Sequence, residues 1–397
     1  MSNKGEKAAL TVISFTQIAS DVRISRHIRY LSDEFDITSI GYGPRPTNVT
    51  RHIEIPTSTK YLPLSLVGIV QLLLNLRGST TLKSQAVEYV SSQLSALKPK
   101  IVLINDVQCL PLIDSLDSDS VTVIDMHEYA PLEMEDDWRF RILLQRYYTY
   151  LCDKYLRKAD AVVTVSGGLA QRYSQDFDIH VEVVRNARDY VDIDSEPSKD
   201  DVLRLVHTGL AARGRHLDKM IRAVGNLPGV SLSLYLVEAP RQKRTLKGLR
   251  KVCASYDNCV IETPVPSSEL PTTISNYDAG FLYIHPSNFS LKHSLPNKLF
   301  DCIQARRPVV VGPAPDLSGF VQKFGIGYVA DSYDVEDVRA LVASLDKKEL
   351  LKLRENLNRA AETVNAQTEC QKLLSVIQDA MRASRHKESL QSKPEQD

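Results

Sequence analysis

The amino-acid sequence predicts an α/β protein made of two Rossmann-like domains that face each other across a cleft. Short apolar strands alternate with amphipathic helices along almost the whole chain, which favours parallel sheets with helices on both faces. The alternation falls into two series, separated by the polar, acidic segment 186–201. The 397 residues exceed the size at which a single hydrophobic core usually stops growing. We therefore expect two domains, with ligands bound at the carboxyl ends of both sheets.

The first series begins with a buried strand and a helix whose apolar residues Ile24, Ile28 and Leu31 recur at helical spacing. Ser79 or Thr80 would cap a later helix that ends near Leu97. In chain order we predict strands over 9–15, 36–40, 101–104, 121–124, 161–165 and 181–184, and helices over 21–35, 80–97 and 138–157.

The second series repeats this alternation after the polar segment. Asp334 would cap a helix that begins near Val335, and from there the chain is mostly helical to about Arg382, with a polar, disordered tail beyond it. The predicted strands cover 203–207, 232–236, 260–262, 279–284 and 308–311, and the predicted helices before Asp334 cover 215–224, 241–254, 270–276 and a segment that opens with His293 to Asp301.

Composition excludes several classes of protein. Lys plus Arg equals Asp plus Glu, at 49 each, so the chain lacks the basic excess of a nucleic-acid-binding protein. The six cysteines are scattered without a CxxC pair, which indicates reduced core thiols rather than disulfides or a zinc site. The amino terminus has no apolar region of signal-peptide length and runs directly into a predicted strand. We expect a cytoplasmic protein.

The most apolar segment is Tyr61 to Leu76, YLPLSLVGIVQLLLNL, which is shorter than a transmembrane helix. It has the length of either a buried helix or a helix that lies in a membrane interface, and Arg77 ends it. Because short apolar segments are ambiguous by periodicity, we favour a core or lid helix over the interfacial one.

The segment 293–311, HSLPNKLFDCIQARRPVVV, is the most informative part of the sequence. It places His293, Asn297, Lys298 and Asp301 at the start of a predicted helix, and helix N-termini attract phosphates. Lys298 and Asp301 are three residues apart and share one face. That pattern suits a ligand with a diphosphate, for Lys298, and a ribose, for Asp301; an ordinary amphipathic helix is the alternative.

A glycine-containing loop is predicted after the strand 203–207. Gly209 and Gly214 allow close approach of the backbone to a ligand, and Arg213 and Arg215 flank the start of the next helix. Such turns are common, so the loop alone is weak evidence. Together with Lys298 it would supply fixed cations for one diphosphate.

Polar residues also follow two strands of the first series. Asp125, His127 and Glu128 lie at or just after the strand 121–124, where side chains can point into a ligand crevice. His127 and Glu128 could position a hydroxyl or transfer a proton, and we favour this over a surface histidine. Asp106 holds the same kind of position after 101–104, where a helix cap is the simpler interpretation.

No metal site is predicted. The two DxD-like triplets, Asp117 to Asp119 and Asp192 to Asp194, lie in a predicted turn and in the linker, and we interpret both as solvated acidic loops. Four closely spaced tyrosines indicate a packing face rather than a stacking platform: Tyr147, Tyr148, Tyr150 and Tyr155.

Taken together, these segments resemble the GT-B glycosyltransferases, specifically family 4 (glycosyl transferases group 1) and its bacterial relatives. Residues 21–41 are similar to the family's first helix and second strand, and 159–173 to a late strand of its N-terminal domain. VVRNA at 183–187 resembles the end of that domain, and HTGLAARGRHLDKMIRA at 207–223 resembles the phosphate loop. The segment that begins at His293 resembles the nucleotide-ribose helix.

The resemblance implies a domain layout. It implies an N-terminal acceptor domain over 1–188, a linker over 189–201 and a C-terminal donor domain over 202–363. A helix over 364–383 would pack back on the N-terminal domain, and 384–397 would be a disordered tail.

The resemblance also implies a retaining transfer of a sugar from a nucleotide-diphosphate donor to an acceptor hydroxyl, usually without a metal or other cofactor. Lys298 and a loop arginine would neutralise the leaving diphosphate, since preorganised cations and helix N–H groups can replace a metal. Arg213-Gly214 resembles the family's Lys-Gly pair, with Arg215 as the alternative. The remaining implied donor contacts are the Gly209 backbone, Asp301 at the ribose, and His293, Ser294, Leu295 and Asn297 beside them.

On the acceptor side, the resemblance places His127 near the reacting sugar, with Glu128 and Asp106 as further candidate catalytic residues. The implied partners are a nucleotide-sugar donor and a glycan or lipid-linked acceptor of cell-envelope or polysaccharide synthesis. No nucleic acid is implied, and contact with the inner face of the cytoplasmic membrane is compatible with the apolar segment.

The sequence departs from the family pattern at several positions. His293 replaces the first Glu of the E-x7-E motif, Leu210 replaces a frequent Arg, and Asn105 replaces a frequent His. The glycine-rich first loop is replaced by residues 16–20, TQIAS. Two other hypotheses therefore stay open: a GT-B sugar-nucleotide epimerase or hydrolase, and a GT-B scaffold without catalysis.

Overall fold

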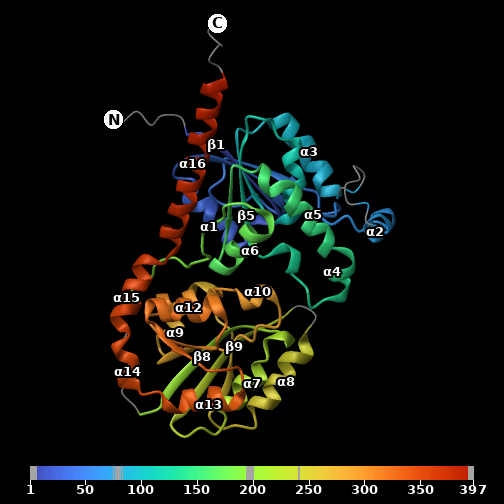
Figure 1. Cartoon of the computed structure of the whole chain (residues 1–397). Helices are drawn as coiled ribbons and strands as arrows, with labels where there is room; N and C mark the ends of the chain where they lie inside the picture. Colours follow the sequence, from blue (N-terminus) through green and yellow to red (C-terminus); the bar gives the residue numbers. More distant parts are fainter. Residues whose placement is uncertain are drawn as a thin grey trace, which may run out of the picture. The chain divides into compact units, whose positions relative to one another are not determined.

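The computed structural model describes residues 7–74, 76, 82, 84–193, 201–239 and 242–391 (Figure 1). By their internal contacts the residues form two compact units. Unit 1 comprises Met1–Arg185 and Glu369–Asp397, and unit 2 comprises Asn186–Thr368. Each unit contains a parallel sheet with helices packed against it, so the predicted α/β class is confirmed.

The sheet of unit 1 has seven strands in the order β3-β2-β1-β4-β5-β6-β7, all pairs being parallel. The chain moves outward from β1 to β3 and then crosses to β4 on the other side of β1. The carboxyl ends of β1 and β4 therefore border the point where strand order reverses, which is where open α/β sheets bind ligands. The strands are β1 (Ala8–Gln17), β2 (Phe35–Tyr42), β3 (Arg51–Ile55), β4 (Ile101–Asn105), β5 (Val121–Met126), β6 (Ala161–Thr164) and β7 (Glu182–Val183).

The helices of unit 1 begin at capping residues that the sequence supplies. The Asp21 carboxylate accepts hydrogen bonds from the backbone of Arg23 and Ile24 at the start of α1. Ser84 caps α3, whereas the expected caps Ser79 and Thr80 lie outside the described residues. The helices are α1 (Val22–Leu31), α2 (Leu66–Leu73), α3 (Gln85–Leu97), α4 (Trp138–Leu143), α5 (Gln145–Tyr155), α6 (Gly167–Phe177) and α16 (Ala366–Gln391).

Two helix predictions in unit 1 need correction. The single helix expected over 138–157 is divided at Leu144, whose φ of −108° departs from helical geometry, into α4 and α5. The disordered tail expected from residue 384 is wrong as far as Gln391, where α16 ends. Residues 384–391 contain neither Gly nor Pro to stop the helix, and 392–397 lie outside the described residues.

The helix α16 belongs to the core of unit 1. Its residues Leu373 and Ile377 are fully buried and pack in the same cluster as Leu10 and Val12 of β1. Three of the four tyrosines expected on a packing face, Tyr147, Tyr148 and Tyr155, are buried, and Tyr150 is partly exposed. All six cysteines are free and buried as expected.

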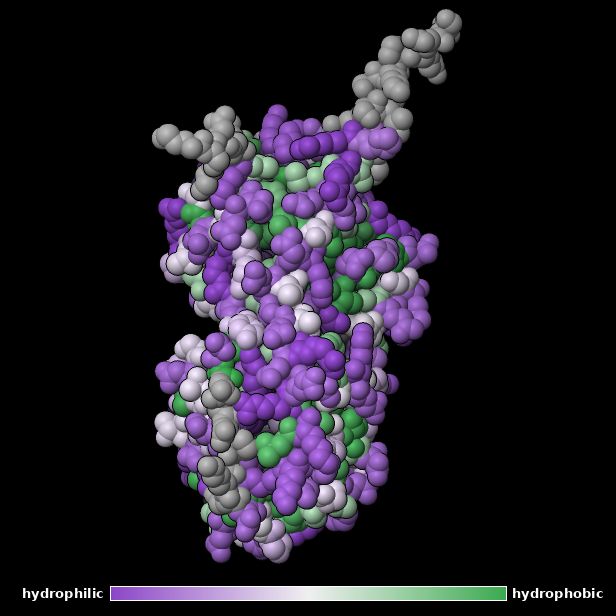
Figure 2. Space-filling view, turned by 90° about the vertical axis from the view of Figure 1, so that its left-hand side faces the viewer, coloured by the Kyte–Doolittle hydropathy of each residue, from purple (hydrophilic) through white to green (hydrophobic). Residues whose placement is uncertain are grey.

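The apolar segment 61–76 is not a core helix, which corrects that part of the favoured prediction of a core or lid helix. It forms α2, in which Gly68 and Leu72 are buried. The outer face of α2 consists of the exposed side chains of Leu66, Val67, Val70 and Leu73. Among the helices of the described residues, none combines the length and the apolar character that crossing a membrane requires. Hydrophilic side chains cover most of the surface seen in Figure 2, with smaller apolar patches between them.

The sheet of unit 2 has six parallel strands in the order β10-β9-β8-β11-β12-β13, with its reversal of strand order between β8 and β11. Strand β8 pairs with β11 only at Leu205 and Val206, but with β9 as far as Ala211. The loop expected from residue 208 is therefore strand up to Ala211. The strands are β8 (Leu203–Ala211), β9 (Val230–Glu238), β10 (Cys259–Glu262), β11 (Ala279–Leu282), β12 (Val309–Val311) and β13 (Gly327–Val329).

Helices cover both faces of this second sheet, each over a separate hydrophobic cluster. One cluster includes residues of α7, α8 and α13, and the other includes residues of α9, α11, α12 and α15. The helices of unit 2 are α7 (Leu217–Val224), α8 (Lys243–Cys253), α9 (Leu270–Ile274), α10 (Phe289–Lys292), α11 (Asn297–Gln304), α12 (Pro315–Phe324), α13 (Val335–Ser344), α14 (Lys347–Lys352) and α15 (Arg354–Thr363).

The start of the expected linker is packed on unit 2. The Val191 N–H donates to Gln304 Oε1 at 2.9 Å, and Arg306 Nη2 donates to the Val191 carbonyl at 3.0 Å. Residues 194–200 of the expected linker lie outside the described residues.

Candidate active site

In unit 1, the side chains expected at the strand ends form one cluster centred on His127. Its Nε2 lies 3.3 Å from Asp125 Oδ2 and its Nδ1 lies 3.3 Å from Asp106 Oδ1. The parallel pairing of β4 with β5, which places Asn105 opposite Asp125, brings Asp106 and His127 to the same edge of the sheet. His127 and Asp106 are partly exposed, whereas Asp125 is completely buried.

A buried arginine that the sequence did not single out holds Asp125 in place. Arg23 of α1 donates from Nε to Asp125 Oδ2 at 2.9 Å and from Nη2 to Oδ1 at 2.8 Å. Burial would raise the pKa of Asp125, but Arg23 and His127 lower it far below its usual range. Asp125 is therefore a permanent anion that anchors the cluster, while Asp106 and His127 face outward.

Electrostatics keep His127 positively charged. Burial opposes the charge, but Asp106 and Asp125 outweigh it and raise the pKa of His127 to about 9. Burial and the neighbouring Asp125 raise the pKa of Asp106, although His127 partly offsets this. At neutral pH the cluster presents an imidazolium, which can donate a hydrogen bond but cannot accept a proton.

Asp106 has an unusual backbone conformation. Its φ of 67° and ψ of 158° lie in a region that glycine normally occupies, at a typical cost of about 1–3 kcal/mol. Its side chain makes no capping hydrogen bond to the following 3-10 helix, so the helix-cap interpretation is wrong. Strain of this kind persists where the surrounding structure imposes it, and here it accompanies the contact with His127.

Glu128 follows His127 just after the end of β5. It is exposed, and its backbone carbonyl accepts a hydrogen bond from the Tyr173 hydroxyl at 2.7 Å. Burial, followed by the charges of Asp106 and Glu128, raises the pKa of Glu133 to about 7. Sequence reasoning missed Glu133, because it follows the strand end by seven residues and no spacing rule marks it.

In unit 2, Gly209, Lys298 and Arg215 meet at one point. A Cβ on Gly209 would lie 2.9 Å from Lys298 Nζ and 3.6 Å from Arg215 Nη1. The φ of Gly209 is +144°, which also disfavours any other residue. Because Gly209 has no side chain, the backbone of β8 is open to a ligand at the point where Lys298 and Arg215 lie.

The two cations repel each other, and Lys298 is buried whereas Arg215 is partly buried. Lys298, only 6% exposed, is the second residue of α11, where backbone N–H groups are free to bind an anion. Burial and the neighbouring Arg215 lower the pKa of Lys298 to about 7, even though Asp301 acts in the opposite direction. Burial also lowers the pKa of Arg215. A polyanionic ligand would relieve this repulsion.

His207 borders the same cations from β8. It is buried, its Nδ1 bonds to the Phe281 carbonyl at 2.7 Å, and its Nε2 has no hydrogen-bond partner among the described residues. Burial, then Lys298 and Arg215, lower its pKa far below the usual value, so the ring is neutral.

The start of α11 is tied to the segment expected to be a linker. Arg188 Nη1 lies 2.8 Å from Asp301 Oδ1, and the Asn186 amide donates to Asn297 Oδ1 at 3.0 Å. Sequence reasoning missed Arg188, although it directly follows the VVRNA motif at 183–187.

His293 lies at a helix end, not at a helix start as expected. It follows α10, and Pro296 separates it from α11. Its Nδ1 lies 2.7 Å from Asp316 Oδ2, and its ring lies 4.5 Å from the Phe289 ring. Ser294 donates to the Leu291 carbonyl at 3.1 Å, and Leu295 packs against the hydrophobic core.

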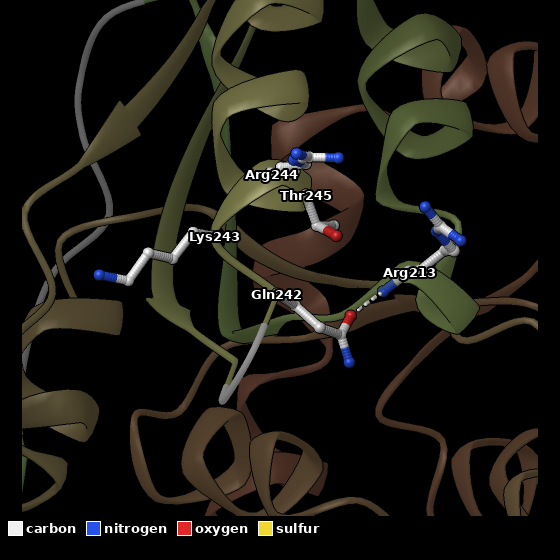
Figure 3. Close-up of a pocket in the computed structure, with 5 residues that line it drawn as sticks. All are labelled: Arg213, Gln242, Lys243, Arg244 and Thr245. Carbon is white, nitrogen blue, oxygen red and sulfur yellow. Dashed lines mark hydrogen bonds between the residues drawn. The ribbon is translucent and has the colours of Figure 1, made fainter.

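Arg213 faces a different space from Arg215. It lines a cavity of about 710 Å³ together with Gln242, Lys243, Arg244 and Thr245. Figure 3 shows its backbone N–H bonded to Gln242 Oε1, at 2.9 Å, and the Lys243 side chain turned away from the others. Of the two loop arginines, it is Arg215 that reaches Lys298.

Nowhere in the described residues do three His, Cys, Asp or Glu side chains gather as metal ligands would.

No protein-family model matches the sequence, and no curated protein matches it. Solved structures do resemble the chain. Sucrose-phosphate synthase from Thermosynechococcus elongatus aligns with a TM-score of 0.71 and 11% identity, over 95% of this chain and 100% of that one. Anabaena Alr3699/HepE in complex with UDP and glucose gives 0.68 and 10%, over 94% and 100%.

A third similar structure is the lipopolysaccharide outer core galactosyltransferase WaaB, with a TM-score of 0.66 and 11% identity, over 94% of this chain and 99% of that one. These proteins are GT-B glycosyltransferases, and the likeness covers nearly the whole chain. The chain therefore has the GT-B fold, as the sequence resemblance implied.

Proposed function

We propose that the chain is a retaining glycosyltransferase that moves a sugar from a nucleotide-diphosphate donor to an acceptor hydroxyl, in the synthesis of a cell-envelope glycan or polysaccharide. The observation that carries the proposal is the meeting of Lys298, Arg215 and the side-chain-free Gly209 at the start of α11. A buried lysine beside a partly buried arginine favours a ligand that supplies negative charge.

A nucleoside diphosphate fits this requirement. Lys298 and Arg215 would bind the diphosphate, whose oxygens would also accept from free N–H groups of α11. Asp301, held by Arg188 at 2.8 Å, would accept from ribose hydroxyls. As the sugar–phosphate bond breaks, charge grows on the leaving diphosphate, and these groups stabilise it without a metal.

On the acceptor side, we propose that His127 positions the reacting sugar or the acceptor hydroxyl as a fixed hydrogen-bond donor. With a pKa of about 9, it is protonated at neutral pH and cannot serve as a general base. The partly exposed Asp106 lies beside His127 and would orient the imidazolium. We do not extend this role to Glu128, whose side chain is exposed.

The proposal is tested by donor turnover in purified variants. Lys298→Ala and Arg215→Ala should each lower turnover by about 10²–10³-fold, the usual loss when one group that stabilises a developing oxyanion is removed. Lys323→Ala, which removes an exposed lysine of α12, is the matched control and should leave turnover unchanged. Wild-type turnover in Lys298→Ala would refute the diphosphate assignment.

The same assay separates transfer from other reactions of sugar nucleotides. A transferase consumes donor in proportion to the acceptor and forms a glycoside with the donor's anomeric configuration. Consumption of the donor in water alone, unaffected by any acceptor, would contradict the proposal and indicate a hydrolase or epimerase.

A further inference from the structure

Large exposed apolar side chains are concentrated in one place on unit 1. Seventeen such side chains occur in the described residues, and ten of them belong to two segments, around α2 and α4, that contact each other. Concentrations of this kind mark interaction surfaces, whereas single exposed apolar residues need no explanation. The α2–α4 surface consists of Tyr61, Leu66, Val67, Val70, Leu73, Leu74, Leu76, Met134, Trp138 and Ile142.

The outward face of α2 is fixed by how the helix packs. Exposed positions 66, 67, 70, 73 and 74 recur at helical spacing, so they form one continuous stripe. The opposite side carries Leu72, which is buried, and Gly68, where a Cβ would lie only 2.1 Å from the Pro63 carbonyl oxygen. Gly68 therefore packs closely against the segment that leads into α2, on the side of the helix opposite the stripe.

The α4 segment extends the same surface with a tryptophan. Trp138 and Ile142 are four residues apart on one side of α4, and both are exposed. The Arg139 guanidinium lies 5.6 Å from the Trp138 ring. Tryptophan and arginine beside an aliphatic stripe are typical of helices that lie in a membrane interface.

Charge around α2 favours an anionic partner. From Ile55 to Val87 the sequence contains no Asp or Glu, and its charged residues are Lys60, Arg77 and Lys83. On α4, Arg139 and Arg141 are exposed. The acidic residues 135–137 precede Trp138, and the Asp137 carboxylate is already bound to the Arg139 N–H as the cap of α4.

We propose that the α2–α4 surface docks the chain on an anionic lipid bilayer, with α2 lying in the plane of the interface. The stripe is too short to span a bilayer, but its aliphatic side chains can enter the acyl boundary while basic residues contact lipid headgroups. This inference goes beyond the proposed function and does not depend on it, since no donor or acceptor takes part in the docking.

Trp138 is the only tryptophan of the chain, so its fluorescence reports on this surface without a label. With vesicles of phosphatidylcholine and phosphatidylglycerol, we expect the full chain to float with the lipid and its emission to shift to the blue. With phosphatidylcholine alone, binding should be much weaker. Absence of flotation with the anionic vesicles would overturn the proposal.

A matched pair of double variants tests the surface itself. Val70→Ser with Leu73→Ser changes side chains that are 53% and 57% exposed on α2. Val260→Ser with Leu351→Ser makes the same chemical change on unit 2, at 46% and 43% exposure. The α2 variant should bind anionic vesicles at least about tenfold more weakly, given the apolar area it loses, and the control should bind like wild type.

Two further results would overturn the proposal. One is equal vesicle binding by the two double variants. The other is a blue shift of Trp138 that grows with protein concentration in the absence of vesicles, which would show that a second copy of the chain covers this surface. Either result leaves the donor-site proposal intact, because donor turnover is measured without lipid.

Discussion

Lys298 is a buried cation that destabilises the folded chain. Its pKa falls from 10.5 to about 7, and each pKa unit corresponds to about 1.4 kcal/mol. Between pH 7 and pH 10 the unfolded state binds more protons at this group than the folded state, so stability rises with pH across that window. Below pH 7 both states are protonated and the penalty is complete.

We therefore predict that Lys298→Met raises the melting temperature at pH 7 while abolishing donor binding. The gain should shrink toward pH 10, where Lys298 of the wild type is neutral. Thermal melts of both proteins across this range provide the check. A Lys298→Met chain less stable than wild type at pH 7 would show that the lysine is not held as described.

Donor affinity should itself depend on pH. An intact nucleotide sugar needs Lys298 protonated, so its affinity should fall as pH rises from about 7 to 9, by at most about tenfold per unit. Titration calorimetry measures this. Lys298→Arg keeps its charge throughout the range and should flatten the profile; an equally steep fall in that variant would assign the pH dependence to another group.

In unit 1 the two aspartates should behave differently. Asp125→Asn leaves Arg23 buried without its anion and should cost about 3–5 kcal/mol of stability.

Asp106→Asn should leave the fold intact but lower the pKa of His127, so the alkaline limb of the turnover profile should move below pH 9. Denaturant unfolding and a pH–rate profile distinguish these outcomes, and an unchanged limb would exclude Asp106 as the group that orients His127.

At the residue scale, the sequence located the strand-end residues but not their partners. His127 and Asp106 follow neighbouring strands, and parallel pairing brings such residues together. Arg23 and Asp316 could not be predicted, because they come from helices 102 and 23 residues away from the side chains they contact. Such pairs depend on tertiary packing, which one sequence does not encode as a local pattern.

At the element scale, the extension of β8 to Ala211 is what positions Gly209 under Lys298. Gly209→Ala would both strain the backbone and push Lys298 Nζ, and we expect it to weaken nucleotide binding severely. Gly229→Ala is the control, because Gly229 also has a positive φ but no atom within 4 Å of its added Cβ. Binding titrations of both variants provide the measurement; equal affinities would contradict the close-approach role.

Elements with strong periodicity were predictable and short or context-dependent ones were not. The buried strands β4, β5 and β11 stand out as apolar segments, and their predicted positions are confirmed to within two residues. The half-buried strands β3 and β13 were missed, since they carry no continuous apolar pattern. The helix α12 was missed although Leu317, Phe320 and Val321 recur at helical spacing. The outward face of α2 was the less favoured alternative for its segment, because apolar composition alone indicates burial.

At the scale of the whole molecule, the chain leaves unit 1 after Arg185 and rejoins it at Glu369. The stability of unit 1 therefore depends on the last helix. Ile377→Ala removes a fully buried side chain and should cost about 2–5 kcal/mol. In calorimetry, the transition assigned to unit 1 should move to lower temperature and that of unit 2 should not; a shift of both, or of neither, would contradict this assignment.

In the proposed function, Lys298 and Arg215 bind the diphosphate of a nucleotide donor. The most direct test is thermal stabilisation of the wild type, Lys298→Ala and the control Lys323→Ala by UDP, GDP, ADP, TDP and CDP. We predict that one nucleotide stabilises wild type and control, by about 2.7 kcal/mol at roughly 100 times Kd, but not Lys298→Ala. Stabilisation of Lys298→Ala to the same extent as wild type would contradict this assignment. So would the failure of every nucleotide and every intact nucleotide sugar to stabilise any of the three proteins.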